Sequence, residues 1–92
     1  MPKRKIRLLI VEDSSFFVKR LVSIIGTADD IDIIGIADNG MDALDKIEEL
    51  DPDVVTMDIT MPLLDGIEVV RRVMKKKKLP IIMLSAHTSE GA

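Results

Sequence analysis

Residues 6–13 of the chain read IRLLIVED, and residues 54–58 read VVTMD. Each stretch is an apolar run closed by acidic residues, which are Glu12 and Asp13 in the first and Asp58 in the second. A continuous apolar run rich in branched residues, as in Ile6–Val11, is typical of a strand that is covered on both faces of a sheet. We therefore predict two strands that carry carboxylates at their carboxyl ends.

Two helix patterns separate these strands. The first follows Ser14, a good N-cap residue, and has apolar residues at helical spacing up to Gly26, a natural C-terminal stop. The second follows the turn at Asn39-Gly40 and is broken by Asp51-Pro52. The segment between the two helices, rich in isoleucine, is predicted as a further strand.

A third helix is predicted from the pair Asp65 and Glu68, which resembles a capping box. Its inward-facing residues are expected to be Ile67, Val70 and Met74. The predicted strands are then residues 6–11, 31–37, 53–58 and 81–84. Because strand and helix alternate to residue 85, the chain is predicted to have an α/β fold, a parallel sheet wrapped by helices on both sides.

The composition limits the classes of function. With 92 residues, the chain is expected to form one domain with a modest core. Its net charge of −3 argues against a duplex nucleic-acid binder, and the absence of cysteine excludes disulfides and thiolate metal sites. The apolar run Ile6–Val11 is too short for a membrane span or a signal-peptide core, so we expect no membrane partner and take the cytoplasm as the default location.

Polar residues gather where the predicted strands end. In a parallel sheet wrapped by helices, ligands bind outside the carboxyl ends of the strands, which is where Glu12, Asp13, Asp58 and Ser85 are expected to lie. Close carboxylates repel one another unless a hard divalent ion such as Mg²⁺ compensates their charge. With that metal, Asp58 is the expected nucleophile toward phosphorus, and Ser85 could donate its hydroxyl to a phosphoryl oxygen. This pattern predicts a switch rather than a turnover catalyst.

Three ordered motifs carry a family resemblance: VEDSSF at residues 11–16, MDITMPLLDG at 57–66 and IIMLSAHT at 81–88. Together they resemble the receiver domain of two-component response regulators, most closely the receiver of the chemotaxis protein-glutamate methylesterase. The resemblance implies a flavodoxin-like fold and an Asp58 that accepts phosphate from a histidine kinase. It also implies that Glu12, Asp13 and the Thr60 backbone carbonyl hold Mg²⁺, with Ser85 as the switch hydroxyl.

The chain departs from this family at its far end. Receivers continue with a fourth helix, then a fifth strand, the lysine after it and a fifth helix, and the methylesterase adds an effector domain; residues 1–92 contain none of these, so we read them as one incomplete receiver-like domain. Whether this chain has any enzymatic activity therefore stays open. The edge of the last predicted strand, Ile81–Leu84, is expected to be exposed and to favour a homo-oligomer.

Three alternatives remain beside the receiver reading. Phosphatases with an aspartate nucleophile use a second Asp two residues on, where this chain has Thr60. A flavin-binding module is disfavoured because the carboxylates at the first strand end would repel a phosphate. The chain could also be a half-fold that self-associates and is not phosphorylated. We assign no role to His87, and we attribute Lys75–Lys78 to the end of the third helix, where cations are favoured.

Overall fold

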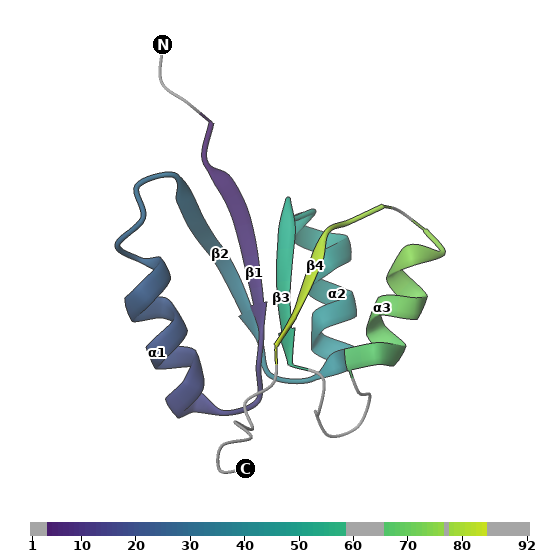
Figure 1. Ribbon diagram of the computed structural model, residues 1–92. Coiled ribbons are helices and arrows are strands. Elements are labelled where there is room, and N and C mark those ends of the chain that lie inside the picture. Colours follow the sequence, from purple (N-terminus) through teal and green to yellow (C-terminus); the bar gives the residue numbers. More distant parts are fainter. Residues whose placement is uncertain (1–3, 59–65, 77, 85–92) are drawn as a thin grey trace.

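The computed structural model describes residues 4–58, 66–76 and 78–84, and these form four strands and three helices in alternation (Figure 1). The elements are β1 (Ile6–Val11), α1 (Ser15–Ile25), β2 (Ile31–Ala37), α2 (Gly40–Leu50), β3 (Val54–Asp58), α3 (Gly66–Met74) and β4 (Ile81–Leu84). All neighbouring strands are parallel, and their order is β2-β1-β3-β4. The predicted α/β class and the parallel sheet are therefore confirmed.

The predicted ends of the first two helices are also confirmed, and each has a local cause. The Ser14 side chain accepts a hydrogen bond from the backbone N–H of Phe17, which caps α1, and the helix ends before Gly26. Asn39 caps α2 in the same way. At the other end of α2, Asp51 adopts a left-handed conformation with φ of 50° and closes the helix before Pro52.

The helices are divided unequally between the two faces of the sheet. Figure 1 shows α1 on one side and α2 with α3 on the other. The main core lies between the sheet and the α2/α3 pair, and it contains Leu9, Val11, Ala37, Ala43, Ile47, Val55, Met57, Val69, Val73 and Leu79. Side chains alternate along a strand, so the strand residues that lie between these core residues point to the other face of the sheet, where α1 lies. Helix α1 has no buried residue. The α1 face of the sheet is therefore covered less completely.

The prediction for the inward face of α3 was wrong at two of its three positions. Ile67 and Met74 are exposed, whereas the buried residues of α3 are Gly66, Val69 and Val73. Only Val70 packs partly against the core. Glu68 forms ion pairs with residues of the next turn of α3, and Asp65, the other half of the predicted capping box, lies outside the described residues.

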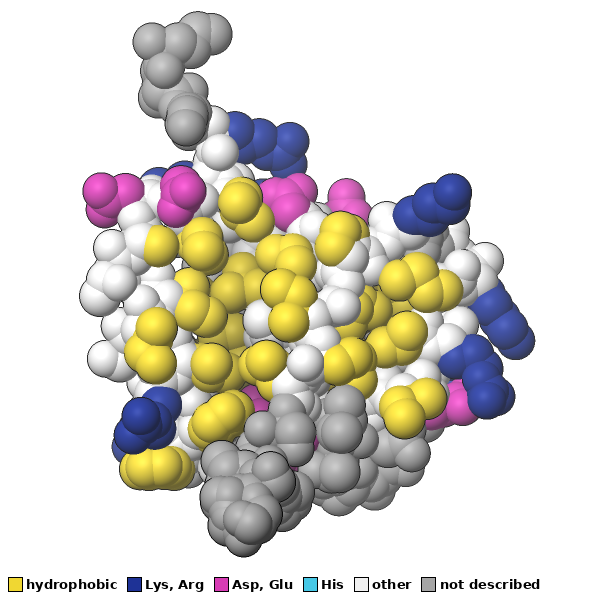
Figure 2. Space-filling view, viewed as in Figure 1, with side chains coloured by type: hydrophobic (Ala, Val, Ile, Leu, Met, Phe, Trp, Pro, Cys, Tyr) yellow, Lys and Arg dark blue, Asp and Glu magenta, His cyan; other side chains and the backbone are white. Residues whose placement is uncertain are grey.

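Strand β4 is the outer strand of the described sheet and exposes apolar side chains. Ile82 is 53% exposed and Met83 is 38% exposed, while Ile81 packs against the core. Figure 2 shows hydrophobic side chains gathered over this part of the molecule, between α1 and α3. Two residues of β4 thus expose apolar side chains, and the exposure of its edge stays a prediction. None of the helices in the described ranges is long and apolar enough to cross a membrane.

Candidate functional site

The two central strands bring the acidic residues to one edge of the sheet. Strands β1 and β3 are neighbours, and Val11 is paired with Met57, so the residues that follow these two emerge side by side. At the opposite end of the same strands, Asp53 accepts a hydrogen bond from the N–H of Arg7 through Oδ2 and donates its own N–H to the Arg7 carbonyl, both at 2.8 Å. This double contact fixes how β1 and β3 are aligned, and with it the relative positions of Glu12 and Asp58.

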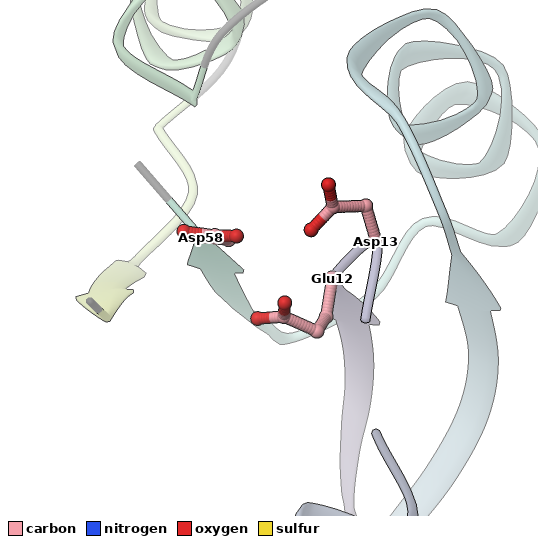
Figure 3. Close-up of side chains that lie close together, drawn as sticks. All are labelled: Glu12, Asp13 and Asp58. Carbon is pink, nitrogen blue, oxygen red and sulfur yellow. The ribbon is translucent and has the colours of Figure 1, made fainter. Parts of the chain in front are cut away.

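Glu12, Asp13 and Asp58 form an acidic cluster at that edge. Each offers a carboxylate oxygen, and these oxygens lie within 4.8 Å of one another. Figure 3 shows the three side chains around a common space, with Asp58 at the end of β3 facing the pair that follows β1. Glu12 and Asp58 are buried, whereas Asp13 is exposed. The predicted convergence of these three residues is therefore borne out by the fold.

The backbone around Glu12 is held in place by neighbouring elements. Its N–H donates to the carbonyl of Ala37 at 2.9 Å, which continues the pairing of β1 with β2 beyond Val11. The N–H of Ser14 donates to Glu12 Oε2 at 3.2 Å. Because Ser14 also caps α1, one residue fixes both the start of the helix and the orientation of the carboxylate. Sequence reasoning identified the cap but not this second contact.

Burial dominates the electrostatics of Glu12. Loss of solvent is the largest cause that raises its pKa from the ordinary 4.5 to about 7, and the Asp58 and Asp13 carboxylates act in the same direction. The hydrogen bond from the Ser14 N–H favours the charged form and opposes this shift. A cation in the cluster would favour ionised Glu12, because it would replace repulsion between carboxylates by attraction.

The chemistry of the donors fits a hard divalent cation. All three ligand groups are carboxylates, which are the ligands preferred by Mg²⁺ and Ca²⁺, and no softer nitrogen or sulfur donor belongs to the described cluster. The cluster could therefore hold such an ion. The two other predicted site residues, Thr60 and Ser85, lie outside the described residues.

Comparisons with known proteins agree with this arrangement. Residues 8–92 match the model of the response regulator receiver domain. Over 91 residues the chain is 45% identical to a protein-glutamate methylesterase/protein-glutamine glutaminase of Syntrophomonas wolfei, a match that covers 99% of this chain and 25% of that protein. A second such protein, from Pyrococcus abyssi, is 44% identical and is matched over 24% of its length.

Solved structures show the same similarity. The response regulator domain of Thermotoga maritima CheB superposes with a TM-score of 0.86 and 47% identity, over 97% of this chain and 66% of that one. A chain of the CheX-CheY-BeF₃-Mg²⁺ complex from Borrelia burgdorferi gives a TM-score of 0.83 at 37% identity, over 96% of this chain and 67% of that one.

The chain therefore belongs to the response regulator receiver domain family, and within it the similarity is to the receiver of CheB-type chemotaxis methylesterases. The flavodoxin-like fold and the family resemblance predicted from three short motifs are both confirmed. The chain spans about a quarter of the length of the curated relatives it matches. Their methylesterase and glutaminase activities are therefore not assigned to it.

Proposed function

We propose that this chain is the phosphoacceptor module of a two-component, chemotaxis-type signalling protein, and that Asp58 receives a phosphoryl group from the phosphohistidine of a histidine kinase. An Asp58 carboxylate oxygen attacks phosphorus, the P–N bond to the imidazole breaks, and the imidazole nitrogen keeps the electron pair. The observation that carries the proposal is the buried Asp58 carboxylate at the end of a central strand, beside two further carboxylates.

The remaining roles follow the chemistry of the cluster. Glu12, Asp13, Asp58 and the Thr60 carbonyl would hold Mg²⁺, which when bound neutralises charge on the phosphoryl oxygens. The complex of the Borrelia burgdorferi relative contains Mg²⁺ and BeF₃, which supports this choice of metal. The Ser85 hydroxyl would donate a hydrogen bond to a phosphoryl oxygen. Thr60 and Ser85 are assigned from the motifs they occupy, since both lie outside the described residues.

The position of Asp58 within the cluster favours it as the nucleophile. Glu12 and Asp13 are adjacent in sequence and leave the same strand end, so both can serve one metal while Asp58 faces them from β3 (Figure 3). A phosphorylated Asp58 would then regulate a methylesterase effector outside this chain, in the cytoplasm.

The test is phosphorylation by a small phosphodonor. Incubation of the protein with acetyl phosphate and Mg²⁺, followed by intact-mass measurement, should give one phosphoryl adduct that requires the metal and is absent in Asp58→Ala. The matched control is Asp45→Ala, which removes an exposed carboxylate from α2 and should leave the adduct unchanged. An unmodified wild-type protein, or an adduct that survives in Asp58→Ala, would refute the proposal.

A second assay, incubation with a generic phosphoester and Mg²⁺, tests the phosphatase alternative. A phosphatase of that class would hydrolyse a generic phosphoester with turnover, which needs an acid/base group two residues after the nucleophile. Thr60 at that position cannot ionise in the way an aspartate does. We therefore expect an adduct that decays slowly and no sustained release of inorganic phosphate.

The apolar edge of β4 supports a second proposal, that the isolated chain forms a homo-oligomer. An unpaired strand edge offers hydrogen-bonding groups to another chain, and the exposed Ile82 and Met83 add apolar surface that would be removed from water. Two copies paired through this edge would be related by a two-fold axis. This assembly does not depend on phosphorylation, so the adduct measurement and a molar-mass measurement test the two proposals separately.

A further inference from the structure

A groove between α2 and α3 lies away from the acidic cluster. Its volume is about 360 Å³, within the range of sites that accommodate a few apolar groups of a ligand. Leu44 and Ile47 of α2 and Val73 of α3 line it with apolar surface. Ile47 and Val73 belong to the core, so the floor of the groove is the outer surface of a packed helix pair rather than a flexible loop.

The border of this groove is strongly basic. Arg72, Lys75 and Lys76 line it on the α3 side, and Glu48 is the acidic residue that lines it from α2. The whole chain has a net charge of −3, yet six of its 13 basic residues fall between positions 71 and 78. Figure 2 shows Lys and Arg side chains gathered on the side of the molecule where α3 lies. Three of these six basic residues line the groove, beside its apolar floor.

Ion pairs within the chain neutralise this border only weakly. Lys76 Nζ lies 4.0 Å from Glu48 Oε1, and both side chains are more than three-quarters exposed. Arg72 Nε lies 3.1 Å from Glu68 Oε2 in an exposed pair on the same helix. Exposed pairs of this kind are screened by solvent and exchange easily for other partners. Lys75 and Lys76 therefore remain available to an anionic ligand.

The end of a helix explains part of this charge but not the groove. Cations are favoured near the carboxyl end of a helix, and Lys75 and Lys76 directly follow Met74, the last residue of α3. This preference for cations at a helix end does not explain why apolar side chains lie beside Lys75 and Lys76. The combination of an apolar floor and a basic border matches a ligand with one apolar side and acidic flanks.

We propose that the groove between α2 and α3 binds an acidic amphipathic helix of a partner protein. The two helices run side by side (Figure 1), so a third helix could lie along the depression between them. Apolar side chains of the partner at positions i, i+3 or i+4 and i+7 would contact the half-buried Leu44 and the small exposed parts of Ile47 and Val73, each of which is 4% exposed. The aliphatic stems of the basic lining residues would add to this apolar contact. Its flanking carboxylates would face Lys75 and Lys76. None of the acidic-cluster residues lines this groove, so the inference is independent of the phosphoacceptor proposal.

The probe for this proposal is a synthetic helical peptide with leucine at the i, i+3, i+4 and i+7 positions and glutamate elsewhere. Titrated into ¹⁵N-labelled protein, it should shift the amide signals of α2 and α3 that surround the groove. The double variant Lys75→Glu/Lys76→Glu should weaken binding by roughly tenfold or more, since attraction becomes repulsion. Added salt should also weaken binding to the wild-type protein.

The matched control lies near the amino terminus. Arg4 and Lys5 are also adjacent, exposed cations, and neither lines the groove or the surface depression on α1. Arg4→Glu/Lys5→Glu changes the net charge by the same amount and should leave peptide affinity within about twofold of the wild-type value. An otherwise identical peptide with lysine in place of glutamate should not bind. The proposal is refuted if the acidic peptide fails to bind, shifts signals of α1 instead, or is weakened equally by both double variants.

Discussion

Burial of Glu12 makes the stability of the metal-free protein depend on pH. Its pKa is raised from 4.5 to about 7 on folding, so between these values the folded protein binds more protons than the unfolded chain. The free energy of unfolding should therefore fall as pH rises from about 4.5 to about 7, by an amount on the order of a few kcal/mol for this group alone. Urea unfolding in the presence of a chelator, at several pH values across this window, measures the effect.

A variant and a control isolate the contribution of this carboxylate. Glu12→Gln cannot ionise and should lose most of the pH dependence in this window, whereas Glu49→Gln, at an exposed position of α2, should retain it. Adding Mg²⁺ should stabilise the wild-type protein most at the upper end of the window, because binding to the ionised cluster favours the folded state. An equal slope in wild type and Glu12→Gln would show that burial of this residue is not the cause.

The positions of the site residues were more predictable than their electrostatics. Glu12, Asp13 and Asp58 each lie at the carboxyl end of a predicted strand, and the rule that parallel strands end at one edge of the sheet predicts that they lie together. The raised pKa of Glu12 could not be predicted in the same way. This pKa depends on how deeply the Glu12 side chain is buried and on the hydrogen bond that its carboxylate accepts from the Ser14 N–H. Both are set by tertiary packing.

At the scale of elements, the contact between β2 and α2 passes through Gly35. A Cβ at this position would lie 2.9 Å from Leu50 Cδ1 and 3.3 Å from Leu9 Cδ1, closer than side chains normally pack. Leu50 is the last residue of α2, so Gly35→Ala should press on the end of this helix and destabilise the protein by about 1 kcal/mol. Urea unfolding of the variant gives this value directly.

A double-mutant cycle shows whether that crowding is the cause. Leu50→Ala removes the nearest atom, so the loss of stability in Gly35→Ala/Leu50→Ala should be smaller than the sum of the two single losses, by about 0.5 kcal/mol or more. Leu44→Ala is the matched control, because this leucine of α2 is not among the three closest neighbours of the added Cβ. Simple additivity in the Leu50 cycle would contradict the proposed contact.

The error in α3 shows why helix faces are harder to predict than helix positions. Five of the nine residues of α3 are apolar, so its sequence contains two overlapping apolar stripes at helical spacing. One stripe contains Ile67 and Met74, and the other contains Val69 and Val73. The second faces the core, and the choice depends on how the helix is rotated against α2 and the sheet. This rotation is set by packing against neighbouring elements, so it cannot be predicted from the apolar pattern of one helix alone.

At the scale of the whole molecule, coverage of the sheet is uneven. Two helices cover one face and one helix covers the other, and β4 leaves a strand edge without a neighbour in the described part of the chain. Ile36 of β2 and Ile82 of β4, the two outer strands of the described sheet, are 41% and 53% exposed. A small domain has little stability to spare, so apolar surface of this kind favours association with another surface. The exposed edge of β4 is where we expect that association to begin.

A charge on the edge of β4 should therefore prevent self-association. We expect the wild-type chain to show a molar mass that rises with concentration by light scattering, and Ile82→Lys to remain a monomer, because a lysine on a strand edge opposes pairing with a second chain. Ile67→Lys on α3 is the matched control, since Ile67 is 63% exposed and the substitution adds the same charge. That variant should associate as the wild type does. A wild-type chain that stays monomeric at every concentration, or equal dissociation of both variants, would exclude an interface at the β4 edge.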